Sequence, residues 1–207
     1  MKKLFITFEG IEGSGKTTQA KLLNEYLLSQ ERKVLFSREP GGPKIAEQIR
    51  TILLDNENRE MTPETELLLY LAARHQHTTE WLLPALERGE IVICDRYFDS
   101  TFAYQGIARS LNLASVKLMN DFATNLLKPD LTFILDIPAE LLIYRLLKKK
   151  MDRIESETVG FHHKVRDAFL NISKYDERYV VIDGRDEIYM IHEKIISKVN
   201  DKLKETT

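Results

Sequence analysis

Five short apolar runs alternate with longer segments of helical periodicity along this chain. The runs are rich in Val, Ile, Leu and Phe, which is typical of parallel strands buried on both faces. They cover residues 4–8, 34–37, 91–94, 131–136 and 179–182. Helices between such strands predict a doubly wound α/β fold, in which a five-stranded parallel sheet is flanked by helices on both faces.

The segments between and after the runs contain the predicted helices. These cover residues 16–28, 44–55, 63–75, 79–88, 115–127, 139–149, 156–175 and 187–204. Neither a repeat nor a linker interrupts the pattern, so we predict one domain over residues 1–207.

The first apolar run leads into a glycine-rich pattern that carries the chemistry. Gly10-x-x-x-x-Gly15-Lys16-Thr17 follows the strand and opens a helix, as in a phosphate-binding P-loop. Glycines let backbone N–H groups point inward, and the helix adds its positive N-terminal end. Lys16 is predicted to reach the β- and γ-phosphates and Thr17 to bind Mg²⁺. The alternative, a glycine-rich turn that happens to contain lysine, leaves the helix that follows unexplained.

Charged side chains follow other strands at the same edge of the predicted sheet. Asp95 and Arg96 come directly after the third run. In P-loop enzymes a carboxylate at such a position holds Mg²⁺, and an arginine beside it suits a phosphate. An ordinary salt bridge at a strand end is the alternative, and the P-loop favours the functional interpretation because it requires a metal partner.

Two further patterns leave a functional and a structural interpretation open. Lys148 to Arg153 form a basic run that suits either a solvated helix end or a lid closing over phosphates. Tyr70 and Arg74 lie four residues apart on one helix face. They suit a nucleobase pocket, although a core tyrosine and a helix C-terminal cation are the more common meaning of this spacing.

Composition excludes several classes of protein. A formal net charge of −2 argues against a nucleic-acid partner. One cysteine, Cys94, and five histidines without ligand spacing argue against a disulfide framework or a zinc site. Without an apolar window long enough for a membrane span or a signal peptide, we expect a cytoplasmic protein that does not contact membranes.

Together these segments resemble bacterial thymidylate kinases, which are P-loop nucleoside monophosphate kinases. The resemblance rests on FEGIEGSGKTTQAKLL, SREPGG, TELLLYLAAR, ICDRYFDSTFAYQG, LLKPDLTFILDI and MDRIESE, in that order over residues 5–155. It implies phosphorylation of dTMP to dTDP by ATP with Mg²⁺, in dTTP biosynthesis. It also implies a homodimer and a short lid at about residues 148–157.

The resemblance assigns roles to individual residues. Catalytic roles fall to Lys16, Asp95, Arg96 and Arg153, and Mg²⁺ to Thr17 and Asp95. ATP binding falls to Gly10, Ile11, Glu12, Gly13, Ser14, Gly15, Lys16, Thr17, Thr18 and Arg145. dTMP binding falls to Glu12, Arg38, Arg50, Tyr70, Arg74, Arg96, Thr101, Tyr104 and Gln105. Within this last set, Glu12 is expected to contact the 3′-hydroxyl of dTMP, and Arg74 and Gln105 the thymine edge.

The resemblance singles out the lid as the part that departs from the family pattern. Gly13 stands where other subtypes carry a P-loop arginine, so a lid cation is expected to replace that charge. Arg153 is the candidate, although lysines occupy positions 148–150 where relatives often have arginines.

Two rival functions are phosphorylation of another nucleoside monophosphate or a deoxynucleoside, and a GTP-dependent switch. The switch is disfavoured because the sequence has no Asn-Lys-x-Asp.

Overall fold

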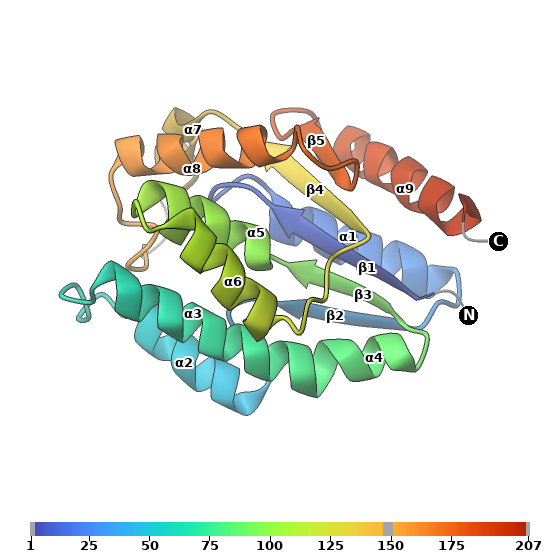
Figure 1. The fold of residues 1–207 in the computed structure, drawn as a ribbon. Coiled ribbons are helices and arrows are strands. Elements are labelled where there is room, and N and C mark those ends of the chain that lie inside the picture. Colours follow the sequence, from blue (N-terminus) through green and yellow to red (C-terminus); the bar gives the residue numbers. More distant parts are fainter. Residues whose placement is uncertain (1–2, 147–150, 206–207) are drawn as a thin grey trace.

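The structure is a computed structural model that describes residues 3–146 and 151–205. Its strands form one parallel sheet in the order β2-β3-β1-β4-β5 (Figure 1). The strands are β1 (Leu4–Glu9), β2 (Val34–Arg38), β3 (Ile91–Asp95), β4 (Leu131–Asp136) and β5 (Tyr179–Asp183). All five predicted strands and the parallel α/β architecture are therefore confirmed, with ends that differ from the prediction by one residue at most.

The described helices are shorter or longer than predicted by a few residues. They are α1 (Lys16–Ser29), α2 (Lys44–Leu54), α3 (Pro63–His77), α4 (Leu83–Glu87), α5 (Phe98–Thr101), α6 (Leu113–Ala123), α7 (Ala139–Leu146), α8 (Val159–Ile172) and α9 (Ile188–Glu205). Two π-helical segments, η1 (Thr78–Leu82) and η2 (Phe102–Ala108), continue α3 and α5. The predicted end of α7 at residue 149 lies outside the described residues.

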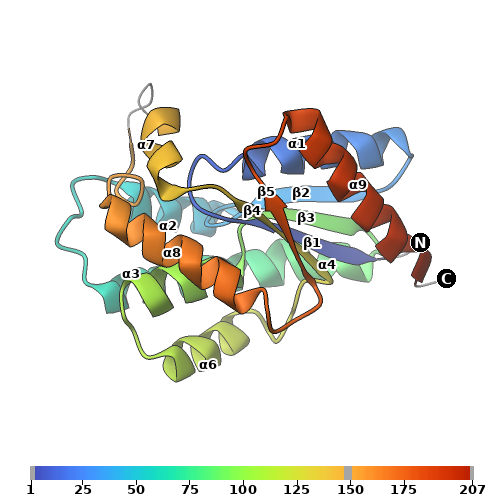
Figure 2. The same cartoon turned by 90° about the horizontal axis from the view of Figure 1, so that it is seen from above.

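The central strand β1 explains why the apolar runs are continuous. Leu4, Ile6 and Phe8 pack on one face of the sheet with α1 and α9. Phe5 packs on the other face, against Leu82 of η1 and residues of α4. Figure 2 shows α1 and α9 together on one side of the sheet and α4 on the other. Because successive side chains of a strand point to opposite faces, a strand covered on both faces carries apolar residues at most of its positions.

Local hydrogen bonds account for the helix ends that the pattern misplaced. The helix predicted from residue 156 is α8, which begins at Val159. The Thr158 side chain caps it by accepting from the Phe161 N–H. The helix predicted to reach residue 127 ends at Ala123, since Asn125 and Leu126 have positive φ angles of 50° and 61°. Helical structure over residues 98–108 was not predicted. Its buried positions include Asp99, Ser100, Thr101 and Gln105, so apolar periodicity is absent there.

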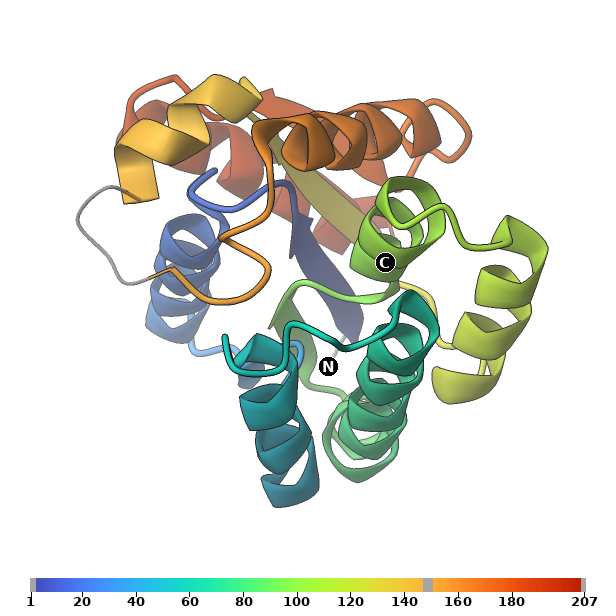
Figure 3. The ribbon, with the colours of Figure 1, turned by 90° about the vertical axis from the view of Figure 1, so that its left-hand side faces the viewer.

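All five strands point their carboxyl ends to one edge of the sheet, which faces the viewer in Figure 3. The P-loop lies at this edge, together with the segment that follows residue 150. Open α/β sheets bind ligands outside the carboxyl ends of their strands, beside the strand where the order reverses. Here that strand is β1, which lies between β3 and β4. Among the described residues, no helix has the length and apolar character that a membrane crossing needs.

Candidate active site

The P-loop curls between β1 and α1 because two of its glycines adopt backbone angles that other residues avoid. Gly10 has a φ of 135°, and a Cβ there would lie 2.5 Å from the Leu135 carbonyl oxygen. Gly15 precedes the first turn of α1 with a φ of 99°. Lys16 lies buried within the loop, where its Nζ donates to the Ile11 carbonyl oxygen at 2.7 Å. Burial lowers the pKa of Lys16 to about 8.

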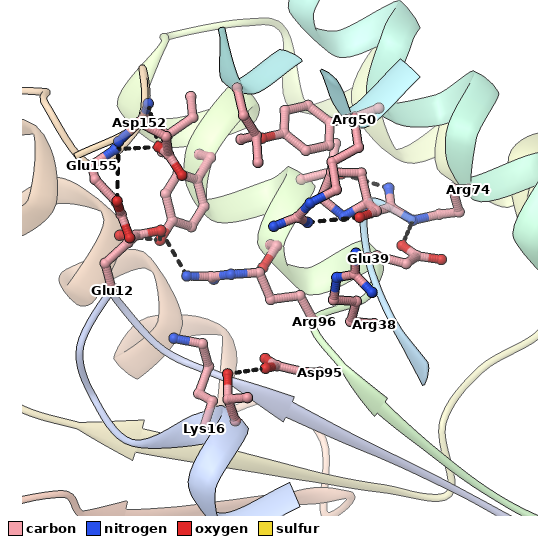
Figure 4. Close-up of a pocket in the computed structure, with 18 of the residues that line it drawn as sticks. Glu12, Lys16, Arg38, Glu39, Arg50, Arg74, Asp95, Arg96, Asp152 and Glu155 are labelled. Carbon is pink, nitrogen blue, oxygen red and sulfur yellow. Dashed lines mark hydrogen bonds and ion pairs between the residues drawn. The ribbon is translucent and has the colours of Figure 1, made fainter. Parts of the chain in front are cut away.

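A cavity of about 250 Å³ extends from the P-loop to α3 and η2, and Figure 4 shows the charged side chains that point into it. Most of the predicted residues line it: Glu12, Gly13, Lys16, Thr17, Arg38, Arg50, Tyr70, Arg74, Asp95, Arg96, Thr101, Tyr104 and Gln105. Gly10, Ile11, Ser14, Gly15 and Thr18 are not among its lining residues and form the rest of the loop and the first turn of α1. Residues far apart in sequence thus meet in one cavity.

Two oxygen ligands suited to Mg²⁺ meet at the end of β3. The Thr17 hydroxyl donates a hydrogen bond to Asp95, and both residues line the cavity. Hydroxyl and carboxylate oxygens are ligands that Mg²⁺ accepts, and it usually takes only one or two carboxylates beside water and phosphate oxygens. These two residues therefore fit the predicted ion.

Arg96 is held in the cavity by a strained backbone and three acceptors. Its φ of 70° is unusual for a residue with a side chain. The guanidinium donates to the Gly10 carbonyl oxygen at 2.9 Å, to Ser100 Oγ at 3.1 Å and to Glu12 Oε1 at 2.7 Å. Burial alone would raise the pKa of Glu12, but Arg96 holds that pKa well below its usual range. The carboxylate in this anion-binding loop is therefore charged and already paired with a cation.

Glu9, at the end of β1, holds the segment that follows Arg96. It accepts from the Tyr97 N–H at 2.8 Å and from Ser100 Oγ at 2.6 Å, and it is fully buried. Burial, together with the neighbouring Asp99 charge, raises the pKa of Glu9 to about 8. Sequence reasoning gave Glu9 no role, although its position at a strand end was a signal.

Arg74 closes the far end of the cavity, where most of its donors are used by the protein. It donates through Nε to Glu39 at 2.7 Å, through Nη1 to Thr101 and Asn120, and through Nη2 to the Tyr97 carbonyl oxygen at 3.1 Å. A guanidinium has five N–H donors, so one on Nη2 remains beyond these four bonds. His77 contacts the other oxygen of Glu39, with His77 Nδ1 2.9 Å from Glu39 Oε1. Arg74 is thus a rigid group that can offer a single donor.

Gln105 is oriented by Glu66, which lies beneath it on α3. Gln105 Nε2 donates to Glu66 Oε1 at 2.8 Å. Burial would raise the pKa of Glu66, but hydrogen bonds from Arg109 and Gln105 lower it, so this carboxylate is ionised and can only accept. The amide nitrogen must therefore face Glu66, and the amide oxygen is left to accept from a ligand.

Arg153 is not brought to the cavity in this structure. Its side chain is 7% exposed and donates to Glu66 Oε2 at 2.6 Å and to the Leu53 carbonyl oxygen at 2.8 Å. The lid role predicted for Arg153 gains no support from this placement, because its guanidinium is committed to a buried carboxylate. Its neighbours Asp152, Ile154 and Glu155 line the cavity instead. Residues 148–150 and the side chain of Arg145 lie outside what the structure describes.

Comparison with known proteins decides the family. The family model described as thymidylate kinase matches residues 8–195. The chain belongs to the thymidylate kinase family. A thymidylate kinase from Caldanaerobacter subterraneus subsp. tengcongensis is 47% identical over 99% of this chain and 98% of its own length. One from Lactobacillus acidophilus is 45% identical over 100% of this chain and 98% of its own length.

A solved structure leads to the same family. The crystal structure of thymidylate kinase from Ehrlichia chaffeensis is 34% identical and superposes with a TM-score of 0.79, covering 96% of this chain and 99% of that one. Members of the thymidylate kinase family transfer a phosphoryl group from ATP to dTMP and form dTDP. The predicted family, fold and reaction are therefore confirmed.

Within this thymidylate kinase fold, sequence reasoning missed the buried polar residues that support the site. Glu39, Glu66 and His162 are each buried and each lie against a residue predicted to bind substrate. Glu39 carried a signal, since it lies in the quoted segment SREPGG. Glu66 likewise lies in the quoted segment TELLLYLAAR. His162 gave no signal, because a single polar residue in a helix is ordinarily solvated.

Proposed function

We propose that dTMP occupies the cavity and that its phosphate meets the γ-phosphate of ATP between the P-loop and Arg96. The observation that carries this proposal is the convergence of Lys16, Thr17, Asp95 and Arg96 on the floor of one cavity whose far end is closed by Arg74 and Gln105. Cations and a phosphate-binding loop lie at one end. At the other end lie the hydrogen-bonding groups of Gln105 and of Arg74, whose charge is paired with Glu39, as a nucleoside monophosphate requires. Arg38 and Arg50 line the wall nearest the proposed acceptor phosphate.

The proposed reaction needs no general base. A phosphate monoester has a second pKa of about 6, so an oxygen of dTMP is already anionic near neutral pH. Catalysis then consists of alignment and of stabilising the charge that develops on the transferred group. Lys16 and Arg96 are the described cations at that point. Mg²⁺, held by Thr17 and Asp95, would neutralise charge on the β- and γ-phosphate oxygens.

The far end of the cavity suits the edge of thymine. The Gln105 amide oxygen would accept from the N3–H of thymine, and the remaining Arg74 Nη2 donor would reach the O4 oxygen. Cytosine has an acceptor at N3 and a donor at C4, so it would oppose both groups. Tyr70, half-buried in the lining, offers a ring face on which the base can stack.

A homodimer is the proposed assembly. Exposed apolar side chains gather on α3 and α6, where the rings of His75 and Phe122 stack at 5.8 Å. Leu68 is 54% exposed, Leu118 72% and Phe122 77%. Monomers rarely expose contiguous apolar patches of large residues, and a second copy would cover this one. Sedimentation of wild type and Phe122→Asp tests this, since the variant should be monomeric if the patch is the interface.

The test of the proposed function is an ADP-release assay across dTMP, dUMP, dCMP, dGMP and AMP. We expect preference for dTMP, and a preference for any other acceptor would contradict the proposal. Lys16→Ala should abolish transfer while it leaves dTMP binding within about threefold of wild type, because Lys16 is proposed to act on the donor phosphates. Lys21→Ala, on the exposed face of α1, is the matched control and should behave as wild type.

A single domain over residues 1–207 and a cytoplasmic location stay predictions from the sequence.

A further inference from the structure

His162 is a fully buried polar residue with unsatisfied nitrogens, and the proposed reaction does not use it. It lies in the second turn of α8 and is 0% exposed. Neither ring nitrogen has a hydrogen-bond partner among the described residues. Burying a polar group without a hydrogen bond costs free energy, so such groups in a folded protein call for an explanation.

The group that His162 faces is Glu12 of the P-loop. His162 Nδ1 lies 3.4 Å from Glu12 Oε2, which is within the range of an ion pair but outside hydrogen-bond geometry. Glu12 lines the cavity, whereas His162 is not among the lining residues. His162 therefore lies behind Glu12 as seen from a substrate, and any effect on the acceptor must pass through that carboxylate.

The other partners of Glu12 show when His162 would be needed. Glu12 accepts from Arg96 Nη2 at 2.7 Å and from the Tyr104 hydroxyl at 2.7 and 2.8 Å. In the proposed function Arg96 binds the acceptor phosphate, a dianion that competes with Glu12 for the guanidinium. When Arg96 turns to the phosphate, Glu12 loses its hydrogen-bonded cation and keeps only the more distant charge of Lys16, while it stays mostly shielded from solvent. A second donor behind it, beside the Tyr104 hydroxyl, then helps to keep the carboxylate charged and in place.

We infer that His162 is a positioning residue that donates from Nδ1 to Glu12 and holds this carboxylate against the 3′-hydroxyl of the acceptor. Closing the 3.4 Å gap by a few tenths of an ångström gives an ordinary hydrogen bond. Tyr104 and His162 are suited to act together because α8 packs against η2, where the Tyr104 ring lies 6.1 Å from that of Phe161, the residue before His162. The inference rests on the proposed function, in which Glu12 contacts that hydroxyl.

The test compares two acceptors that differ only at the 3′ position, dTMP and 3′-deoxythymidine 5′-monophosphate. The measured quantity is the ratio of their kcat/KM values, because a general loss of activity cancels in it. Glu12→Gln should lower this preference for dTMP about tenfold, as expected for one hydrogen bond to a charged group. His162→Leu should lower it by a similar factor, and the double variant no further than Glu12→Gln alone.

Two more variants separate positioning from packing. His162→Asn places an amide nitrogen where Nδ1 was and should retain most of the preference, whereas His162→Gln, whose amide lies nearer Nε2, should lose it. This pair also decides the matter if leucine prevents folding. His192→Leu is the matched control, because His192 in α9 also has a buried Nδ1 without a partner and packs against Tyr26. It should leave the preference unchanged.

The outcomes distinguish this inference from the proposed function. If Glu12→Gln lowers the preference and the His162 variants do not, His162 is a packing residue and only the inference fails. If the wild type shows no preference, or Glu12→Gln leaves it unchanged, the role of Glu12 in the proposed function fails and the inference with it. A loss in His162→Leu alone, or one that adds to Glu12→Gln, would show that His162 does not act through Glu12.

Discussion

Two pairs of arginine and glutamate lie about the same cavity and have different surroundings. Glu12 and Arg96 meet at 2.7 Å, and both side chains keep an exposed fraction of 12% and 17% toward the cavity. Glu66 and Arg153 meet at 2.6 Å, with exposed fractions of 1% and 7%. In the proposed function, the first pair is opened by a phosphate that competes with Glu12 for Arg96. The second is not, since Arg153 also binds the Leu53 carbonyl oxygen inside the protein. The two pairs therefore differ in whether the carboxylate partner also faces the cavity, as Glu12 does and Glu66 does not.

Among the variants that test the difference between the two pairs, we expect the largest effect on activity for Arg96→Met. Removing a cation that stabilises transferred charge should lower kcat roughly 10²- to 10³-fold. Thermal stability should fall less than in Arg153→Met, because Glu12 is more exposed than Glu66 and keeps Tyr104 as a partner. Steady-state kinetics and a thermal melt measure the two quantities. Arg88→Met, at an exposed pair with Glu90, is the control and should match wild type. A kcat within threefold of wild type would remove Arg96 from the mechanism.

Arg153→Met should behave in the opposite way. Losing one partner of a buried ion pair costs about 3 kcal/mol or more, which lowers Tm by roughly 6–12 °C for a chain of this size. Below that temperature we expect kcat within about threefold of wild type. Arg109→Met is the matched control, because Arg109 pairs with the same Glu66 at 3.1 Å but is more exposed, and it should cost less. A large fall in kcat with an unchanged Tm would instead restore the lid role predicted from the sequence.

Arg74→Ala tests the cavity end that lies away from both pairs. It should raise KM for dTMP roughly tenfold or more and leave KM for ATP unchanged, because a donor to the base and the packing around Glu39 are both lost. Steady-state kinetics with each substrate varied in turn separate the two. Arg74→Lys should not rescue binding, since an ammonium cannot replace the guanidinium fork. Wild-type kcat/KM for dTMP in Arg74→Ala would show that the base binds elsewhere.

The last prediction concerns Glu9, which lies behind Arg96 and affects stability and not activity. Its pKa is raised in the folded protein from 4.5 to about 8, so its contribution to stability is full below pH 4.5 and is lost as the pH rises through 8. Glu9→Gln removes this titration. The variant should therefore gain stability relative to wild type between pH 5 and pH 9, as measured by urea unfolding at both values. An unchanged difference would mean that Glu9 remains ionised when folded.

A feature could be predicted from the sequence when the residues that determine it lie close together along the chain. The strands and the P-loop were predictable, because continuous apolar runs and the spacing of Gly10, Gly15 and Lys16 are local patterns. Residues 98–108 were not predicted as helical, since their buried positions are polar and are satisfied by distant partners, such as Glu9 for Ser100. Arg153 carried the right charge, but its partner Glu66 is 87 residues away.

The sequence by itself determined the family, the order of strands and helices and the phosphate-binding loop, because those depend on local conformation and on the alternation of apolar and polar positions. Only the tertiary structure decided which charged residues face the cavity. Arg96 and Arg153 are the same type of residue in the sequence, and so are Glu12 and Glu66. Their surroundings differ because a charge in the low-dielectric interior must pair with a nearby opposite charge. Packing between elements that are distant in sequence decides which partner is near.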